Sequence, residues 1–252
     1  MLKFLNPTTW SLNACISLFF MSLGCMSVSA GASPERFPED LLRDKLSKPD
    51  QVLDFFGVQP GWQVMDMFAG NGYYSEVLSG VVGPSGKVYL HNNQAYMQFA
   101  TRLQSRVRNN RLPNVEVYIR EIEDINLPSN SLDMVLLVMA YHDAYFTQNG
   151  WTVTAGPLFK TIHRILKPDG ILAIIDHHAA DDTGYSRAQD LHRIEVSFAK
   201  SDVSHRGFQW IGSSDVLENE SDDLTLSVFD PMIRGNTSRF VLKFKKDPEH
   251  VQ

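Results

Sequence analysis

Hydrophobic residues between positions 38 and 246 follow two different periods, and the period separates predicted strands from predicted helices. Short apolar runs bounded by turn-forming residues predict strands at 62–68, 87–91, 114–119, 132–140, 171–176, near 208–212 and at 239–246. Apolar spacings of three and four, with proline and glycine at the ends, predict two short helices within 38–57 and further helices at 74–82, 94–109, 158–166 and 190–206. This alternation predicts a doubly wound, mostly parallel seven-stranded sheet with helices on both faces.

Residues 1–30 differ in composition from the rest of the chain. They hold one charged residue, Lys3, and then an apolar stretch that ends with Val28 and Ala30 at the positions of a small-x-small cleavage site. We expect a secretory leader that is cleaved after Ala30, which would make the mature protein an exported, periplasmic one. The alternatives are that the same segment stays as a membrane anchor, or that Cys25 carries a lipid.

The remaining residues, 31–252, are expected to form a single domain, because their length suits one α/β core and is too short for two. The formal net charge is −6 and no run of basic residues is present, which argues against nucleic acid as a partner. Both cysteines, Cys15 and Cys25, lie in the predicted leader, so the mature chain could form no disulfide. We expect a small-molecule substrate and no stable membrane insertion once the leader is cleaved.

The stretch "DMFAGNGYYSEVL" at 66–78 carries the clearest chemical signal. An acidic residue ends an apolar run, two glycines flank one residue, and an amphipathic stretch follows, as in a strand-to-helix turn that binds a nucleotide-like ligand. Only the first two glycines of the dinucleotide pattern are present, since Ser75 stands at the third position. Asn92 ends the second strand, where a ribose-binding carboxylate normally stands, so a nicotinamide-dependent oxidoreductase is disfavoured.

Three segments resemble the class I S-adenosylmethionine-dependent methyltransferases. "VMDMFAGNGYYSEVLSGVVGPSGKVYLHN" is similar to their first motif and second strand, "IREIEDINLPSNSLDMVLLVMAYHD" to their adenine-contacting segment and fourth strand, and "LFKTIHRILKPDGILAIID" to their fifth-strand unit. The resemblance covers about residues 49–178, and the C-terminal part resembles a bacterial group of predicted methyltransferases with leader peptides. It implies a Rossmann-like methyltransferase fold with S-adenosylmethionine as the cofactor.

The resemblance also implies roles for individual residues. Asp66 would orient the glycine loop. Gly70 and Gly72 would let the backbone run close to the methionine moiety, and the segment after the third strand would contact adenine. Asn92 takes the place of the acid that holds the ribose hydroxyls. An amide lacks the charge-assisted strength of a carboxylate, so we expect Asn92→Asp to tighten cofactor binding. The predicted cofactor-binding residues are Asp66, Phe68, Gly70, Gly72, Asn92, Glu121 and Ile122.

Two histidine-bearing segments follow predicted strands at the ligand edge of the sheet, "AYHDAY" at 140–145 and "DHHAADD" at 176–182. His142 beside Asp143 is the predicted catalytic pair, with the histidine as a base near neutral pH. The other reading is that these are polar loop residues in solvent. No metal site is predicted, because His177 and His178 are adjacent on a strand and point to opposite faces.

Two functions remain open from the sequence. The first is S-adenosylmethionine-dependent methyl transfer to an unidentified small molecule. The second is an exported binding protein that kept the methyltransferase fold and lost the reaction, since this donor is made in the cytosol and the ribose position carries an amide.

Overall fold

The computed structural model describes residues 35–148 and 150–247, all of which belong to one compact unit, Ser33–Gln252. The predicted leader therefore lies outside the described residues. The strands are β1 (Gln63–Met67), β2 (Lys87–Asn92), β3 (Val115–Ile119), β4 (Leu132–Val138), β5 (Leu166–His177), β6 (Phe208–Ser214) and β7 (Arg239–Lys246). The α-helices are α1 (Pro38–Ser47), α2 (Pro49–Phe56), α3 (Tyr73–Val82), α4 (Leu103–Val107), α5 (Ala155–Ile165) and α6 (Val196–Ser204). Short 3-10 helices are η1 (Tyr96–Phe99), η2 (Arg108–Asn110), η3 (Ile122–Asp124) and η4 (His142–Tyr145).

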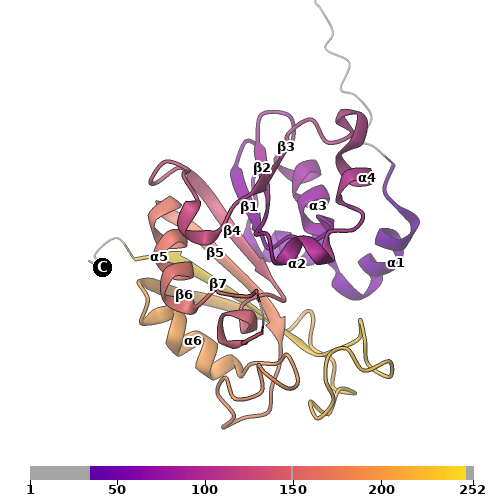
Figure 1. Cartoon of the computed structure of the whole chain (residues 1–252), viewed down its shortest axis with the longest axis vertical. Helices are drawn as coiled ribbons and strands as arrows, with labels where there is room; N and C mark the ends of the chain where they lie inside the picture. The colour runs from indigo at the N-terminus through magenta and orange to yellow at the C-terminus, as the bar shows by residue number, and fades with distance from the viewer. Residues whose placement is uncertain (1–34, 149, 248–252) are drawn as a thin grey trace, which may run out of the picture. The chain divides into compact units, whose positions relative to one another are not determined.

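The seven strands form one mixed sheet in the order β3-β2-β1-β4-β5-β7-β6 (Figure 1). The pairs among β1 to β5 are parallel, whereas β7 pairs antiparallel with both β5 and β6. The predicted strand count is confirmed, and the sheet is not wholly parallel. β7 follows β6 after the connection 215–238, in which no helix is assigned, and an antiparallel neighbour needs no crossover helix.

Helices cover both faces of the sheet, as predicted. Alternate residues of each central strand point to opposite faces, so Val64 packs with α2 and α3 while its neighbour Met65 packs with α5 and α6. The residues of β4 from Met134 to Leu137 are completely buried, which explains why this strand reads as a continuous apolar run. In Figure 1, α5 and α6 lie on one side of the sheet and α2 and α3 on the other.

The topology places a binding site at one edge of the sheet. The chain order reverses between β1 and β4, because β2 and β3 extend the sheet on one side and β5 extends it on the other. At such a switch point the loops after the two central strands separate and leave a crevice at their carboxyl ends. The loops that follow Met67 and Val138 begin there.

The predicted helix at 94–109 is broken into η1, α4 and η2. Two hydrogen bonds between asparagine side chains and the backbone account for the break. The side-chain oxygen of Asn93 accepts from the Tyr96 backbone N–H at 2.8 Å, and that of Asn71 accepts from the Arg102 backbone N–H at 2.7 Å. α4 ends at Val107, because Arg108 is extended with ψ of 147°, and the left-handed φ of 57° at Asn109 interrupts η2. The apolar spacing of the segment is helical, but contacts with the glycine loop interrupt it.

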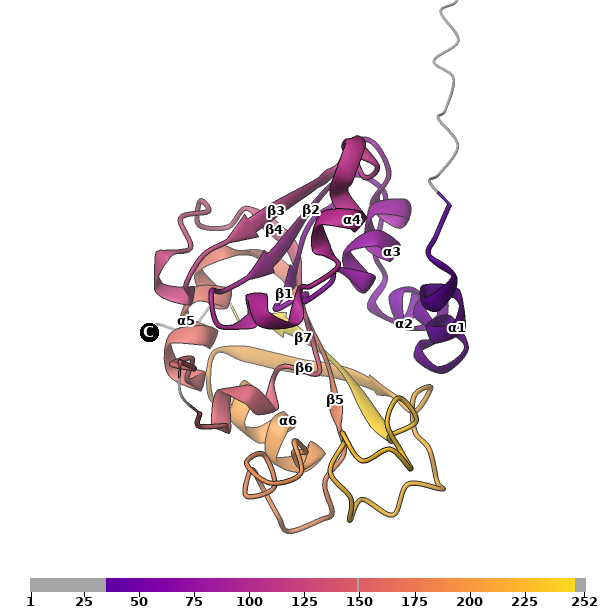
Figure 2. The same cartoon turned by 45° about the vertical axis from the view of Figure 1, so that its right-hand side comes forward.

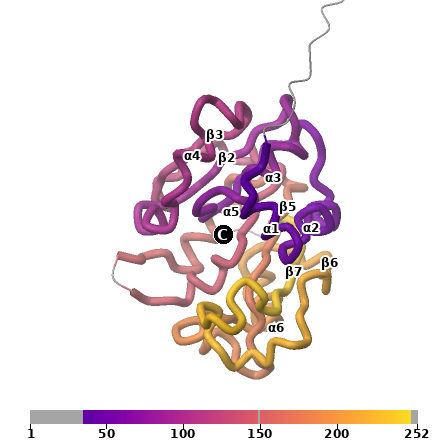
Figure 3. Tube along the Cα trace, turned by 90° about the vertical axis from the view of Figure 1, so that its right-hand side faces the viewer, coloured from indigo at the N-terminus to yellow at the C-terminus, as the bar shows by residue number. Residues whose placement is uncertain are grey.

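Helix α1 has its polar side inward. Asp40 and Ser47 are buried, whereas Leu41, Leu42 and Leu46 are 51%, 63% and 45% exposed. The three leucines, which form the apolar side of this helix, therefore face solvent in the described part of the chain. Figure 3 traces α1 and α2 in indigo at the start of the described chain, and α2 contacts α3. Within residues 35–148 and 150–247, no helix has both the length and the apolar character needed to span a bilayer.

Candidate active site

A cavity of about 470 Å³ opens at the carboxyl ends of β1 and β4, where the topology predicts a ligand site. Its walls come from the glycine loop, from η1 and the loops after β4 and β5, from α1 and α4, and from a segment before β7. Its size is within the range typical of small-molecule sites. The glycine loop, the end of β4 with the loop after it, and the region after β5 thus share one cavity. Its lining includes Asp66, Phe68, Ala69, Gly70, Asn71, Val138, Met139, His142, Asp143, Phe146, His177 and His192.

The glycine loop turns sharply through left-handed backbone angles. Phe68, Gly70 and Gly72 have φ of 58°, 56° and 76°. The two glycines serve different purposes. A Cβ atom on Gly70 would have only Tyr96 near it, at 4.0 Å, whereas a Cβ on Gly72 would come within 2.5 Å of Leu90. Gly70 lines the cavity, and Gly72 allows the loop to pack against β2.

Asp66 is the buried penultimate residue of β1, next to the start of this loop. Its carboxylate accepts a hydrogen bond of 2.6 Å from the Ser75 hydroxyl on α3. Burial raises the pKa of Asp66 to about 6, although the bond from Ser75 lowers it. Ser75, at the position of the missing third glycine, therefore holds Asp66 in place, and the predicted role of Asp66 in orienting the loop stays a prediction.

Asn92 does not face the cavity. Its side chain is fully buried and forms two hydrogen bonds with the backbone of Gly70. The amide oxygen accepts from the Gly70 N–H at 2.8 Å, and the amide nitrogen donates to the Gly70 carbonyl at 3.0 Å. An amide can supply both interactions whereas a carboxylate can only accept. Asn92 fixes the loop, and its predicted contact with a ribose stays a prediction.

The two predicted adenine-contacting residues lie outside the main cavity. Ile122 is buried in the core. The carboxylate of Glu121 accepts from the Gln94 backbone N–H at 3.0 Å and borders a second depression, which shares Ala95 and Gln98 with the cavity. Glu121 therefore stands beside an extension of the cavity, where the family pattern would put the adenine.

An aromatic cluster closes the side of the cavity next to the loop. The rings of Phe68, Tyr96 and Trp151 lie with centroids 5.3 to 5.9 Å apart. Behind them, His91 is fully buried, and its Nδ1 atom lies 3.5 Å from the Phe68 N. Burial lowers the pKa of His91 to about 4, so its ring is neutral at neutral pH. The sequence analysis missed Tyr96 and Trp151, because they stand in irregular segments far from the loop in the chain.

Another part of the lining carries a cluster of charged and titratable groups, which we call the histidine wall: His142, Asp143 and His192, with the fully buried Asp176 behind them. The ring of His142 donates from Nδ1 to the Asp176 carboxylate at 2.8 Å, and the same carboxylate accepts from the His142 backbone N–H at 2.8 Å. The Nε2 atom of His142 lies 3.3 Å from Asp143 Oδ1 and 3.2 Å from His192 Nδ1. The predicted pair, His142 and Asp143, thus lies in contact with Asp176 and His192, which the sequence did not connect to it.

The pKa values on this wall diverge. Burial lowers the pKa of His142, but the carboxylates of Asp176 and Asp143 outweigh it and raise the value to about 9. Burial raises the pKa of Asp143 to about 6 and lowers that of His192 to about 4. The ring of His142 is therefore doubly protonated and positively charged at neutral pH, whereas the sequence predicted a free base. Asp143 is the member of the predicted pair that can accept a proton.

His192 reaches the cavity from the long loop after β5. Its neighbour Arg193 is fully buried and forms a two-pronged ion pair with Asp222, at 2.9 and 3.0 Å. Arg193 also donates to the carbonyls of Leu226 and His178. Figure 2 shows the orange loop after β5 and the yellow segment before β7 at the same end of the sheet. The buried ion pair joins these two segments and so positions His192.

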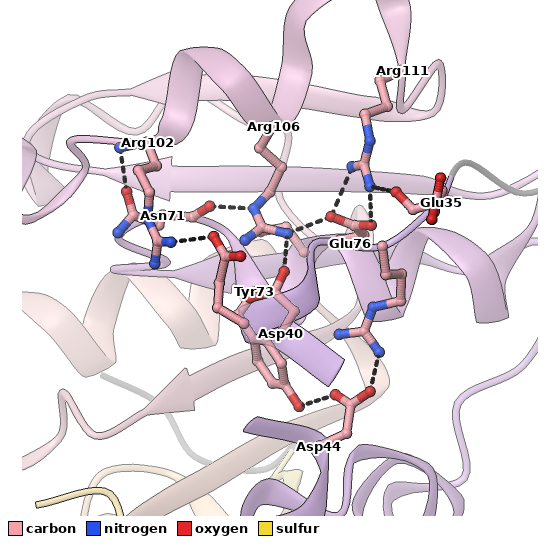
Figure 4. Close-up of polar contacts among 12 residues, drawn as sticks. Glu35, Asp40, Asp44, Asn71, Tyr73, Glu76, Arg102, Arg106 and Arg111 are labelled. Atoms are coloured by element: carbon pink, nitrogen blue, oxygen red, sulfur yellow. Dashed lines mark hydrogen bonds and ion pairs between the residues drawn. The ribbon is translucent and has the colours of Figure 1, made fainter. Parts of the chain in front are cut away.

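A charged network fastens α1 to the glycine loop and α4 (Figure 4). Arg106 of α4 donates to Asp40 of α1 at 2.7 Å, to Glu76 of α3, and to the Asn71 carbonyl of the loop. Arg111 makes two further bonds to Glu76, at 2.6 and 2.8 Å. Asp40 and Arg106 also line the cavity, so α1 forms part of its rim.

Two tyrosines after β4, Tyr141 and Tyr145, do not line the cavity. Both donate their hydroxyl groups to Asp202 of α6, at 2.9 and 2.5 Å. Phe146 lines the cavity beside His192, with ring centroids 4.6 Å apart. Tyr74 is buried on α3 with the core, as predicted, although it touches the edge of the cavity.

Comparison with known proteins agrees with this arrangement. Residues 59–219 match the family described as a methyltransferase domain. A ubiquinone/menaquinone biosynthesis C-methyltransferase of Hahella chejuensis is 26% identical over 145 residues, which span 58% of this chain and 55% of that protein. The chain thus spans about half the length of this relative. The corresponding enzyme of an Escherichia coli strain (O1:K1 / APEC) is 24% identical over 147 residues, or 58% and 54% of the two chains.

Solved structures share the fold. A methyltransferase dependent on S-adenosylmethionine from Aquifex aeolicus superposes with a TM-score of 0.60 at 22% identity and covers 84% of this chain and 100% of its own. Another from Mesorhizobium loti has a TM-score of 0.55 at 14% identity, with 81% and 100% covered. The match to the family extends from the residues before β1 to the segment after β6 and includes the whole glycine loop and the histidine wall. The chain belongs to the methyltransferase domain family.

Proposed function

We propose that this protein transfers a methyl group from S-adenosylmethionine to a small molecule bound against the histidine wall. The observation that carries the proposal is that residues of the glycine loop and of the histidine wall line the same cavity. Methyl transfer needs the acceptor in line with the methyl group and a group that takes the acceptor's proton. In this cavity the glycine loop would hold the methyl donor in place, and the histidine wall would hold the acceptor and take its proton.

The glycine loop fits the donor. Gly70 and its neighbours present backbone without side-chain bulk, and the rings of Tyr96 and Phe99 offer apolar faces beside it. When bound, S-adenosylmethionine supplies an activated methyl group on a positively charged sulfur. The carboxylates of Asp66 and Asp143 face the same cavity and favour a cation there.

The histidine wall and its surroundings fit an acceptor with a flat apolar body and one polar group. Phe146, Trp151 and Phe229 line this part of the cavity, and His142 and Asp143 are its polar members. The similar C-methyltransferases are named for quinone biosynthesis, and a ring-shaped acceptor agrees with these aromatic walls. The acceptor itself remains to be identified.

Titration calorimetry tests the donor side. We expect the full chain to bind S-adenosylmethionine and its demethylated product and not NAD. Tyr96→Ala should weaken both complexes, whereas Tyr185→Ala, an exposed ring outside the cavity, should leave them unchanged. Binding of NAD in place of the sulfonium compound would contradict the proposal.

A second function is favoured by one specific observation. Asn92, at the position of the ribose-binding acid, uses both ends of its amide on Gly70 and offers nothing to a ribose. A binding protein that kept the fold without turnover agrees with this. The transfer of a radiolabelled methyl group to a panel of small phenols and quinols separates the two functions. Product binding without any transfer would favour the binding protein.

We also propose that the protein is exported and acts as a single domain after cleavage at Ala30. The support is the order of Lys3, the apolar stretch and the small residues before position 31. N-terminal sequencing of fractionated cells tests it, with Gly31 as the expected first residue. An intact Met1 on a cytosolic protein would contradict export.

A further inference from the structure

Three possible ligand atoms converge on one point of the histidine wall. His142 Nε2 lies 3.2 Å from His192 Nδ1 and 3.3 Å from Asp143 Oδ1, and the last two atoms are 3.9 Å apart. Ligand atoms about 2.0 to 2.2 Å from a tetrahedral metal are separated by roughly 3.3 to 3.6 Å. We propose that His142, Asp143 and His192 hold a divalent cation of the zinc type, with its fourth position open to the cavity.

The orientation of His142 suits this role. Its Nδ1–H points at Asp176, which is completely buried, so the other nitrogen faces His192 and Asp143. Ring nitrogens that bind metals almost always have a carboxylate or carbonyl on the opposite side of the ring, which fixes the tautomer and strengthens the ligand. Asp176 is that partner here, and it is held in turn by two backbone N–H groups, of His142 and His177.

The placement of His192 is a second, independent observation. Its backbone has a left-handed φ of 54°, which is unfavourable for a residue with a side chain. Its ring lies between Phe146 and Phe229, with centroids 4.6 and 4.8 Å away, and the buried Arg193–Asp222 pair anchors the next residue. Strained backbone of this kind is kept where the surrounding structure holds a functional group in place. The restraint aims Nδ1 at the other two ligand atoms.

The donor set selects the metal. Two imidazole nitrogens and one carboxylate oxygen suit zinc and its neighbours in the first transition row, whereas magnesium prefers six oxygen ligands. Three protein ligands with one free position are typical of catalytic zinc sites. If the proposed methyl transfer is correct, the free position would bind an oxygen atom of the acceptor, because the site lines the acceptor side of the cavity.

The competing explanation is a proton. A doubly protonated His142 can donate to Asp176 on one side and to Asp143 or His192 on the other, which satisfies the same three atoms without a cation. A direct binding measurement distinguishes a cation from a proton.

The test uses the full chain, stripped with a chelator and titrated with zinc chloride or magnesium chloride in separate calorimetric runs. We expect one zinc ion per chain and no binding of magnesium. Cobalt(II) in place of zinc should give the intense visible absorption of a tetrahedral complex. Failure of the wild-type protein to bind zinc, or a six-coordinate cobalt spectrum, would overturn the proposal.

Variants locate the ion. We expect His192→Ala to lower zinc affinity at least 100-fold and Asp176→Asn to lower it by about 10- to 100-fold. His205→Ala is the matched control, because this exposed histidine at the end of α6 lies outside the cluster. Circular dichroism of each variant shows whether it is folded. Unchanged zinc affinity in folded His192→Ala would place any bound zinc elsewhere.

The outcome is separable from that of the methyltransferase assignment. Zinc is titrated without S-adenosylmethionine, and the sulfonium compound is titrated without zinc. A protein that binds the donor and not the metal would refute the metal site alone, and the reverse result would refute the donor.

Discussion

The two walls of the cavity are built in different ways. The glycine-loop wall is made by one continuous stretch, 66–75, which is held from β2 by the neutral amide of Asn92, and it acts through backbone and a buried acid. The histidine wall brings together residues from the ends of β4 and β5 and from a distant loop, and it acts through charge. A wall that is local in sequence is specified by short-range geometry, whereas an assembled wall depends on the packing that brings its parts together. The following experiments perturb the support of each wall.

The largest expected effect is on the support of the histidine wall. Asp222→Ala leaves the buried Arg193 without its partner, and we expect it to lower the free energy of unfolding by about 3–5 kcal/mol. Denaturant unfolding measures this loss. Asp190→Ala is the control, because its pair with Arg187 is about half exposed and should contribute less than about 1 kcal/mol. Equal losses in the two variants would show that the buried pair does not hold the loop.

Acid should weaken the support of the glycine-loop wall through His91. The folded protein keeps this ring neutral down to a pKa of about 4, whereas the unfolded chain takes up the proton near pH 6.5. The unfolded state therefore binds more protons between these values, and stability falls as the pH falls through this window. We expect a loss of about 3 kcal/mol by pH 4 from this residue.

Comparison with His91→Gln isolates that contribution, since other groups also titrate in acid. Unfolding curves of both proteins at pH 7 and pH 4 give the difference. The pH-dependent part assigned to His91 should be missing from the variant. An identical pH dependence in the two proteins would show that His91 is not the sensitive group.

The two glycines of the loop should differ in their tolerance of a methyl group. Gly72→Ala places a Cβ against Leu90 in addition to adopting a left-handed backbone, and we expect it to cost about 2–3 kcal/mol of unfolding free energy. Gly70→Ala meets only the backbone cost, about 1 kcal/mol, because the space beside it is open. Thermal or denaturant unfolding of the pair checks the order. Equal costs would mean that the loop moves away from β2.

The smallest expected effect concerns Asn92. The sequence favoured tighter cofactor binding in Asn92→Asp, but the structure gives the opposite expectation. A carboxylate cannot donate to the Gly70 carbonyl, so we expect the variant to lose about 1–2 kcal/mol in stability and to bind the demethylated product more weakly. Asn93→Asp is the control, because the Asn93 oxygen accepts from Tyr96 and a carboxylate can do the same. Tighter binding by Asn92→Asp would mean that the ribose faces this residue after all.

The sequence predicted the parts of the fold that follow from local pattern. Strand β1, the turn after it and the buried β4 were recognisable from apolar runs and glycine spacing. The family came from the resemblance of three segments to known methyltransferases, and the match of residues 59–219 confirms it. The predicted helix at 94–109 is not continuous, because Asn71, about thirty residues earlier, accepts a hydrogen bond that interrupts it. Spacing within the segment gives no sign of that contact.

The histidine wall was only half predictable. His142 and Asp143 stand next to each other after an apolar strand, so they were found. Their connection to His192 depends on a loop fixed by the buried ion pair of Arg193 and Asp222. Nothing in the local sequence joins residues 50 positions apart, which is why the sequence did not connect His192 with His142 and Asp143.

The inverted polarity of α1 has a consequence for the timing of ligand exchange. This helix leaves three leucines in solvent and is held by Asp40 and Asp44, which bind Arg106, Arg36 and the Tyr73 hydroxyl. Its release exposes little new apolar surface, so local opening should be cheaper than unfolding of the sheet, and amide hydrogens of α1 should exchange before those of β1 and β4. Because Asp40 also forms the rim of the cavity, each opening of α1 widens the entrance. We therefore expect a variant with weaker ion pairs on α1 to release a bound ligand faster.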